Sequence, residues 1–278
     1  MDLHSITPLV LTYNEAPNIG RCLGRLRWAR EVIVVDSFST DATVAIAGEY
    51  PNTRVVQHAF DDFADQWHWA LDHAQIGTEW VLALDADYVV TREFVDEVSR
   101  LAPEPSVSAY FARFVYAVMG RPVRGGVYPP VAVLFRRDRC RYRQDGHCYR
   151  LVAQHGETRT LEARLVHDDR KSLARWLQSQ AGYMEQEAAK LRSAKRLTKV
   201  DRLRLYTPFA PLAVLAYSLL IKRGIFDGPA GWFYAFQRAV AEGILQLKLL
   251  EHRLGAAPAP QVSEHVNTPI ATSGDRTA

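Results

Sequence analysis

Short apolar runs alternate with helical patterns over the first hundred residues of the chain. Four runs have the length and β-branched content of strands, and the second and fourth resemble strands buried on both faces. They are Ile6 to Thr12, Val32 to Val35, Arg54 to Gln57 and Trp80 to Leu84. Helices are expected after Pro17, near Ala42 with Asp41 as its N-cap, and from about Asp62 to Gln75. This alternation predicts an α/β fold with βαβ units around a mainly parallel sheet.

Polar residues stand where three of these strands are expected to end. The three segments are Thr12-Tyr13-Asn14-Glu15, Asp36-Ser37 and Asp85-Ala86-Asp87. Open α/β sheets bind their ligands outside the carboxyl ends of the strands. We therefore expect the three segments to converge on one crevice.

From Pro103 onward the pattern changes to mixed strands and loops. Strands are expected at Tyr110 to Val118 and Val131 to Arg136, with a glycine-rich connection between them. An amphipathic helix is expected next, because apolar residues recur on one stripe. The stripe comprises Leu173, Trp176, Leu177, Met184, Ala188 and Leu191. After Gly255 the chain is rich in Pro, Ala, Ser and Thr, and we expect this tail to be disordered.

The composition narrows the class of protein. Of 278 residues, 48% are apolar and 23% are charged, which is typical of a globular chain. The net charge of +3 is too small for the basic footprint of a duplex-binding protein, so no nucleic-acid partner is expected. Three cysteines without CxxC spacing argue against a disulfide framework or a cysteine zinc site. The first residues lack a signal-peptide pattern, and we expect a cytoplasmic catalytic part.

Asp85 and Asp87 are the first candidates for chemistry. They follow a buried strand directly, so both carboxylates can reach one cation, and carboxylate oxygens suit Mg²⁺ or Mn²⁺. Such an ion also takes phosphate oxygens and stabilises the charge of a departing nucleotide diphosphate. A solvated loop is the alternative interpretation, since DxD also occurs by chance.

Asp36 and Ser37 have the groups needed to recognise a ribose or a base, although a βα turn in which they satisfy backbone amides remains an alternative. Two other nucleotide sites are disfavoured. The chain has neither the GxGxxG loop of a dinucleotide-binding dehydrogenase nor the GxxxxGK[ST] loop of a P-loop NTPase at this position.

Taken in order, three segments carry a family resemblance. They are Thr12-Tyr13-Asn14-Glu15-Ala16, then Val34-Val35-Asp36-Ser37 with Ser39-Thr40-Asp41-Ala42-Thr43, then Leu84-Asp85-Ala86-Asp87. This pattern resembles family 2 glycosyltransferases, especially those of bacterial lipopolysaccharide core and surface-polysaccharide assembly, over about residues 4 to 250. The resemblance implies a GT-A, Rossmann-like nucleotide-diphospho-sugar transferase domain with a mixed sheet, an inverting single displacement and a divalent metal. It also implies a nucleoside pocket lined by Thr12, Asn14, Glu15, Asp36 and Ser37.

An inverting transfer needs a general base near the acceptor hydroxyl. The resemblance places a carboxylate after a glycine-containing loop, and here Gly125-Gly126 with Tyr128-Pro129-Pro130 matches that loop. Asp145 is then the candidate base. Many relatives have a His-Glu pair near this region, whereas this chain has Cys148-Tyr149-Arg150, and an ordinary tight turn at Asp145-Gly146 is the alternative.

Two further candidates come from the segment that follows a late strand-like run. Enzymes of this fold often complete the metal site with a histidine, which makes His167 the third candidate ligand beside Asp85 and Asp87, although a structural histidine is the alternative. Arg175 is a candidate for the donor diphosphate, because an arginine stabilises a leaving group by charge-assisted hydrogen bonds. A solvated helix face is the alternative for Arg175.

The C-terminal region suggests a membrane surface. A basic stretch with one acid, Asp201, would attract anionic lipid headgroups by about 1 kcal/mol per basic residue. It comprises Lys190, Arg192, Lys195, Arg196, Lys199, Arg202 and Arg204. Thr207 to Ile221 is too short to span a bilayer, and we expect it to be interfacial or re-entrant. Pro229 to Leu250 resembles an interfacial amphipathic helix, although a helical subdomain packed on the core or a dimer interface is the alternative.

We expect a catalytic domain over residues 1–172, divided near residue 100 into a nucleotide-binding half and an acceptor half. A helical, membrane-associated region over 173–254 and the tail over 255–278 complete the expected organisation. The predicted function is an inverting, metal-dependent transfer from a nucleotide-sugar, with UDP-sugar favoured, to a lipid-linked or lipopolysaccharide-type glycan at the cytoplasmic face of the inner membrane. A catalytically inactive sugar-nucleotide-binding scaffold of the same fold is the alternative. A nucleotidyltransferase is a second alternative, which would typically carry a glycine-rich loop that Leu9 to Glu15 lacks.

Overall fold

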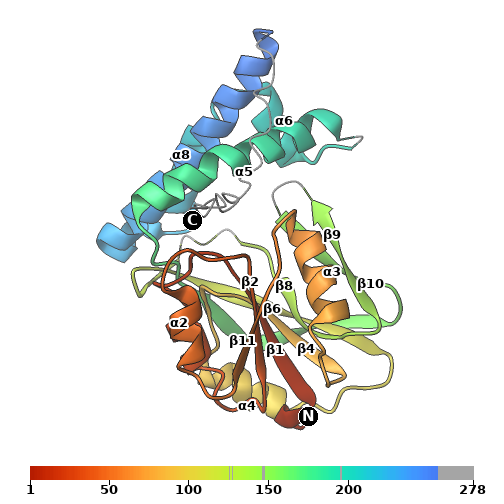
Figure 1. Ribbon diagram of the computed structural model, residues 1–278. Coiled ribbons are helices and arrows are strands. Elements are labelled where there is room, and N and C mark those ends of the chain that lie inside the picture. The colour runs from red at the N-terminus through yellow and green to blue at the C-terminus, as the bar shows by residue number, and fades with distance from the viewer. Residues whose placement is uncertain (125, 127, 146–147, 195, 256–278) are drawn as a thin grey trace, which may run out of the picture.

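The computed structural model describes residues 1–255, except residues 125, 127, 146, 147 and 195. A mixed sheet with helices on both faces forms one part of the molecule, and helices from residues 173–253 form a layer above it (Figure 1). The tail expected to be disordered lies outside the described residues from residue 256 onward.

The first half of the sheet is parallel. Its strands are β1 (Ile6–Thr12), β2 (Val32–Asp36), β3 (Thr53–Gln57) and β4 (Trp80–Asp85), in the order β3-β2-β1-β4. Every residue of β1 and β2 is buried, as expected for strands covered on both faces. Thr12 pairs with Asp36 and Leu11 with Asp85, so the carboxyl ends of the three strands meet at one edge. The three polar segments therefore lie at one edge of the sheet, as predicted, and the crevice between them stays a prediction.

Alternate side chains of these strands enter two different cores. Val10 and Val34 point to the core formed with α1 (Ile19–Gly24), α2 (Thr43–Gly48) and α4 (Arg92–Arg100). Leu9 and Ile33 point to the opposite core, beneath α3 (Phe63–His73). Asp62 caps α3 and Thr91 caps α4, each by accepting a backbone hydrogen bond three residues on. A short 3-10 helix, η1 (Leu3–Ser5), precedes β1.

The expected role of Asp41 is wrong in one respect, because the N-cap of α2 is Ala42, which makes no side-chain capping bond. The Asp41 carboxylate instead accepts hydrogen bonds from the Thr43 and Ala16 amides. It therefore fastens the loop after β1 to the start of α2. Cys22 and Cys140 are buried free thiols, and the side chain of Cys148 lies outside the described part of the structure.

The second half makes the sheet mixed. Its strands are β5 (Tyr88–Val89), β6 (Val107–Val118), β7 (Arg121–Val123), β8 (Val131–Arg136) and β11 (Glu157–His167). Strand β8 is antiparallel to β4 and β6, whereas β11 is parallel to β6 and antiparallel to β5. Both strands predicted here are confirmed, the first starting three residues earlier. A separate hairpin, β9 (Cys140–Asp145) with β10 (Cys148–Ala153), packs against α3.

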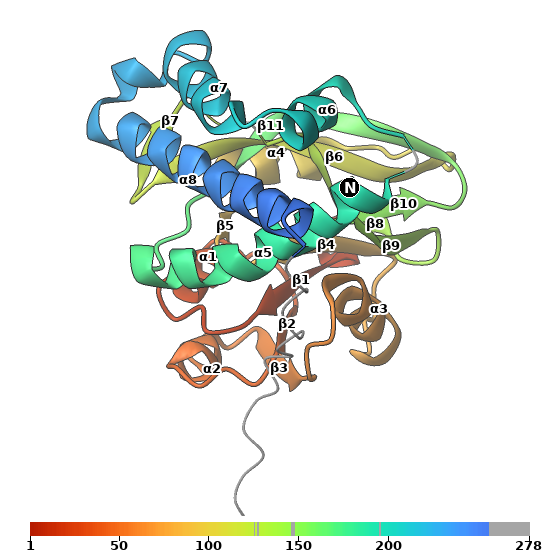
Figure 2. The same ribbon diagram turned by 90° about the horizontal axis from the view of Figure 1, so that it is seen from above.

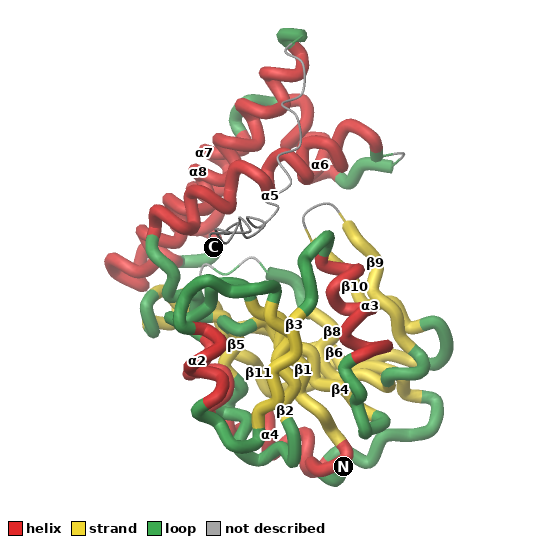
Figure 3. The backbone as a smooth tube through the Cα atoms, viewed as in Figure 1, coloured by secondary structure: helices red, strands yellow, loops and turns green. Residues whose placement is uncertain are grey.

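The C-terminal residues form the helical layer, in which the long helices α5 and α8 cross above the sheet (Figures 2 and 3). Its elements are α5 (Leu173–Ser193), α6 (Lys199–Tyr206), α7 (Ala210–Ala216), the π-helix η2 (Tyr217–Ile221), the 3-10 helix η3 (Gly224–Asp227) and α8 (Gly228–Arg253). Met184 and Leu191 of α5 meet Leu245 and Leu249 of α8 in a small core. No helix in the described part of the chain is both long enough and apolar enough to cross a bilayer.

Two expectations about this layer need correction. The predicted stripe of α5 is buried only in its second half, because Leu173 and Leu177 are 47% and 43% exposed. Arg204, counted among the lipid-attracting cations, lies between α5 and α8. There it donates to Glu187 at 2.8 Å and to Glu242 at 3.0 Å, so its charge is neutralised inside the protein. Lys195 lies outside the described residues.

Candidate active site

Asp87 and His167 meet at the carboxyl edge of the sheet. Asp87 lies between β4 and β5, and His167 is the last residue of β11. Because His167 pairs with Tyr88 of β5 in the sheet, its ring is brought beside the preceding residue, Asp87. The Nε2 atom of His167 lies 3.0 Å from Oδ2 of Asp87, and both side chains are almost buried. Two of the three predicted metal ligands are therefore in contact.

The other carboxylate oxygen of Asp87 is the group that best fits a cation. Oδ1 is buried and accepts no hydrogen bond from any described residue. Burying a carboxylate oxygen costs folding free energy unless the oxygen accepts a hydrogen bond or binds a cation. Among the described residues, no group of three or more His, Cys, Asp or Glu side chains is placed so that it could hold one metal ion. The full ligand set of Asp85, Asp87 and His167 stays a prediction.

Charge stabilises the contact between Asp87 and His167. Burial raises the pKa of Asp87, but the facing His167 and Lys171 outweigh that effect and hold the pKa at about 2. Burial lowers the pKa of His167, but Asp87 and Asp85 outweigh burial, and the net pKa is raised. Asp87 is thus ionised at neutral pH, as a metal ligand must be.

Lys171 carries a positive charge into the same region. Its Nζ donates to Oε1 of Glu15 at 2.6 Å and lies 3.6 Å from Oδ2 of Asp169. Burial lowers the pKa of Lys171, but Glu15, Asp87 and Asp169 outweigh burial and raise it above its ordinary value. Burial raises the pKa of Glu15 to about 7, with Asp87 adding to the rise and Lys171 opposing it. Lys171 is therefore a fixed cation among the carboxylates of the site.

A buried network ties α1 to the segment that follows β11. The Arg21 guanidinium donates to Oδ2 of Asp168 at 2.8 Å, and the fully buried Asn18 donates to Asp169 at 2.8 Å. Asn18 also accepts from the backbone N–H of Arg170. Asn18 and Arg21 were not singled out from the sequence, because nothing local marks a partner about 150 positions away. They fix Lys171 and the first turn of α5 against the donor side of the site.

The residues predicted to line a nucleoside pocket do gather at this edge, but several of them hold the loops together. Asn14 accepts a hydrogen bond from the Thr40 amide at 2.8 Å. The fully buried Asp36 accepts from the Ser39 amide and from Gln57 Nε2, at 2.9 and 3.0 Å. The Ser37 hydroxyl accepts from Gln66.

Thr12 differs from its neighbours. Its buried hydroxyl oxygen makes no hydrogen bond to any described residue, so this oxygen keeps its capacity to bind a further group. The nucleoside-binding role of Thr12, Asn14, Glu15, Asp36 and Ser37 stays a prediction.

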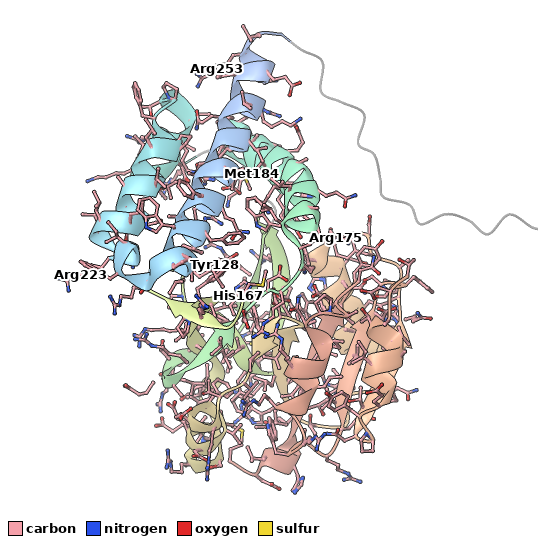
Figure 4. All side chains as sticks on the ribbon, turned by 90° about the vertical axis from the view of Figure 1, so that its left-hand side faces the viewer. Tyr128, His167, Arg175, Met184, Arg223 and Arg253 are labelled. Carbon is pink, nitrogen blue, oxygen red and sulfur yellow. The ribbon has the colours of Figure 1, made fainter. Side chains whose placement is uncertain are left out.

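Arg175 lies in the first turn of α5, where it reaches back over the loop after β1. Its guanidinium carbon lies 5.5 Å from the centre of the Tyr13 ring. The helical layer thereby contributes a second cation to the same edge of the sheet (Figure 4).

The candidate base cannot be placed by contacts. Asp145 is the last residue of β9 and pairs with Cys148 across the hairpin, while its side chain lies outside the described part of the structure. Gly146 and the preceding loop residue Gly125 also lie outside it. The assignment of Asp145 as base stays a prediction.

Aromatic rings surround His167, a feature that the sequence did not reveal. The ring centres of Tyr116 and Tyr128 lie 4.7 and 5.3 Å from that of His167, and Tyr116 also contacts Tyr234 of α8 at 4.8 Å. Tyr128 is 45% exposed and lies beside His167 where the sheet meets the helical layer (Figure 4). The rings orient the histidine and present an apolar face beside it.

A cavity of about 750 Å³ lies elsewhere, lined by residues that precede β1, β3 and β4, including His4 and Glu79. Those residues are at the amino ends of the strands. Since ligands of open α/β sheets bind at the carboxyl ends, the candidate site is the edge that holds Asp87.

Residues 9–151, about half of the chain, match the family model described as Glycosyl transferase family 2. The chain belongs to this family, and the fold predicted from the motif resemblance, a mixed α/β sheet of the GT-A type, agrees with the observed architecture.

Relatives of the chain include an uncharacterized glycosyltransferase of Rickettsia felis, 32% identical over 111 residues, covering 40% of this chain and 38% of the relative. The lipopolysaccharide core biosynthesis glycosyltransferase LpsC of Rhizobium meliloti is 29% identical over 86 residues, 30% of this chain and 31% of that protein. The matches thus span less than half of each of these curated relatives.

Among solved structures, S. aureus TarS 1-349 in complex with UDP-GlcNAc has a TM-score of 0.48 at 16% identity, over 90% of this chain and 92% of TarS. Glucosyl-3-phosphoglycerate synthase from Mycobacterium tuberculosis, in complex with Mn²⁺, UDP and phosphoglyceric acid, has a TM-score of 0.45 at 16% identity, over 70% and 80% of the two chains. Neither similarity is strong enough to transfer a ligand or an activity to this chain.

Proposed function

We propose that this chain transfers a sugar from a nucleotide-sugar, preferably a UDP-sugar, to a lipid-linked or lipopolysaccharide-type glycan acceptor, with inversion at the anomeric carbon. The observation that carries the proposal is the Asp87–His167 pair at the carboxyl edge of the sheet, with a buried Asp87 oxygen that no described residue satisfies. Membership in glycosyltransferase family 2 supplies the reaction class.

Asp85, Asp87 and His167 would hold Mg²⁺ or Mn²⁺. These ions accept two carboxylates and an imidazole as ligands. The buried Asp87 oxygen that has no hydrogen-bond partner would be one of the coordinating atoms. Such an ion, when bound, neutralises the negative charge that develops on the departing diphosphate. Lys171 and Arg175 would add fixed positive charge from the same side, by charge-assisted hydrogen bonds to phosphate oxygens.

Thr12, Asn14, Glu15, Asp36 and Ser37 would bind the nucleoside. The hydrogen bonds of Asn14 and Asp36 to neighbouring loops fix the shape of this wall before any ligand enters. The unpartnered Thr12 hydroxyl supports a polar contact with the donor. A wall fixed in advance reduces the entropy lost on binding.

Asp145 would act as general base. It would take the proton of the acceptor hydroxyl as that oxygen bonds to the anomeric carbon and the bond from that carbon to the diphosphate breaks. Attack from the face opposite the leaving group inverts the configuration. With Asp145 as the base, the acceptor would bind between the β9–β10 hairpin and the edge that holds Asp87. We further propose that the enzyme works at the cytoplasmic face of the inner membrane, beside a lipid-linked acceptor.

Thermal unfolding of the full chain with UDP, GDP, CDP and their sugars, with and without Mn²⁺, tests the donor site. A ligand that binds only the native state raises the midpoint of unfolding. We expect a Mn²⁺-dependent rise with the uridine ligands that is lost in Asp87→Ala and kept in Asp96→Ala, an exposed aspartate of α4. No rise with any nucleotide would reject the proposal. Binding without transfer or donor hydrolysis would identify the catalytically inactive scaffold instead.

A further inference from the structure

Exposed apolar side chains concentrate in one part of the molecule. Most of the large apolar residues that are exposed in the described part of the chain lie between Val200 and Leu254. Ten of these residues have more than half of their surface exposed, and six of the ten, around α7, η2, η3 and α8, define what we call the apolar face: Phe209, Leu212, Leu220, Ile221, Phe226 and Phe236. The other four are Val200, Tyr206, Leu247 and Leu254. Exposed apolar surface concentrated in this way marks an interaction site.

The apolar face follows the helical period. Along α7 and η2 the exposed positions recur every three or four residues, at Phe209, Leu212, Ala216 and Leu220, whereas Ala210 and Leu219 are buried. Helix α7 packs along α8, where the ring centres of the exposed Trp232 and Phe236 lie 5.6 Å apart. The two helices therefore bury one side against each other and the sheet, and leave a second apolar side uncovered.

The charge beside this face is of one sign. Between Asp201 and Asp227 the chain contains no acidic residue. Arg202 and Arg223 are exposed there, and Lys222 is partly exposed. Apolar residues bordered by cations suit an anionic lipid surface, into which the apolar side chains enter while the cations meet the headgroups. In a symmetric dimer formed through this face, by contrast, the cations of two copies would be brought together.

The length of the segment also decides the mode of contact. Residues 210–221 are too few for a helix that spans a bilayer, and no described helix meets that requirement. Since these helices cannot span the bilayer, we expect them to lie with their axes along the membrane surface.

The same helices connect this face to the candidate active site. Tyr234, on the buried side of α8, contacts Tyr116, which contacts His167. The Arg124 amide at the end of β7 donates to Asp227 just before α8. Figure 4 shows Arg223 at the end of the helical layer that lies nearest the sheet, on the side of Tyr128 and His167. The face thus belongs to a layer that contacts the site.

We propose that the apolar face, with Arg202, Lys222 and Arg223, docks onto an anionic membrane surface and thereby presents the active site to an acceptor held in that membrane. The proposal deepens the proposed function, and its statement about the acceptor rests on that function. The docking itself rests only on the exposed face and its charge.

Flotation of the full chain with vesicles tests the docking. One vesicle preparation is phosphatidylcholine alone, and the other also contains phosphatidylglycerol. We expect binding to the anionic vesicles, and a loss of about tenfold in the double variant Leu212→Gln/Leu220→Gln and in Lys222→Gln/Arg223→Gln. The matched control is Leu173→Gln/Leu177→Gln, which changes two exposed leucines of α5 outside the face and should float like the unchanged chain.

Failure of the chain to float, or an equal loss in the α5 control, would overturn the proposal. Hydrogen exchange of the full chain without vesicles tests whether another protein segment, rather than a membrane, covers the apolar face. Protection of residues 209–221 that rises with protein concentration would assign the face to a second copy. Such a concentration-dependent rise would reject membrane docking.

The nucleotide-induced rise in unfolding temperature, measured on the same variants, separates this inference from the proposed function. We expect the rise to be unchanged in the two double variants of the face, because neither pair of residues contacts the site. If the unchanged chain shows the nucleotide-induced rise in unfolding temperature but does not float with the vesicles, docking alone is rejected. Flotation without any nucleotide effect would reject the proposed function and leave docking standing.

Discussion

The parallel half of the sheet and the C-terminal helical layer use the same apolar residue types in different ways. In β1 and β2 every side chain is buried, so each apolar residue contributes to one of the two cores. In α5 and α8 large apolar side chains are divided between a small core and open surface. The difference teaches that apolar content alone does not distinguish a core element from an interaction surface. Four variants, one of them double, test the two regions in order of decreasing effect.

The largest effect is expected at the edge of the parallel half. Asp87→Ala removes the carboxylate that pairs with His167, and donor hydrolysis or transfer should fall by about 10³-fold, since removing one preorganised electrostatic group commonly costs that much. Steady-state assays with a UDP-sugar and Mn²⁺ measure the loss. Asp96→Ala should keep full activity, and equal activity of the two variants would show that the Asp87 edge is not the site.

Ile33→Ala tests the two-sided burial of β2. The side chain has no exposed surface and lies in the core beneath α3. Its truncation should lower the free energy of unfolding by about 2–5 kcal/mol, through lost burial and the cavity left behind. Denaturant unfolding followed by circular dichroism measures it. A cost below about 1 kcal/mol would contradict the tight packing of this core.

Arg204→Ala tests the polar contact inside the helical layer. The change leaves Glu187 and Glu242 facing each other without their shared cation, and it should cost about 3 kcal/mol. The same unfolding measurement applies. The exposed Arg202→Ala provides the matched control and should change stability by less than about 0.5 kcal/mol. Similar costs for the two variants would indicate that Arg204 is not held between α5 and α8.

Leu212→Gln/Leu220→Gln should have the smallest effect on folding. Both leucines are more than 60% exposed, so replacing them should change the free energy of unfolding by less than about 0.5 kcal/mol. The difference in unfolding free energy between this variant and Ile33→Ala compares exposed with buried apolar residues most directly. A loss of stability of several kcal/mol would place these leucines in a core and remove the apolar face.

The amino-acid sequence determined the parts of this protein that depend on local pattern. The strands from β1 to β4 and the strands β6 and β8 follow from short apolar runs, and the three polar segments follow from where those runs end. The motif resemblance predicted membership in glycosyltransferase family 2 correctly. The motif residues follow directly after short apolar runs, so they could be recognised without the structure.

Only the tertiary structure decided which distant residues meet. The contacts of His167 with Asp87 and of Lys171 with Glu15 join positions 80 and 156 residues apart. They depend on β5 pairing with β11 and on α5 returning over the loop after β1. Arg204 was counted among the lipid-attracting cations and is a largely buried partner of two acids. Leu212 belongs to a segment expected to be interfacial or re-entrant, and its side chain is exposed. A helical pattern shows that two faces differ, but the packing of neighbouring helices decides which of them is covered.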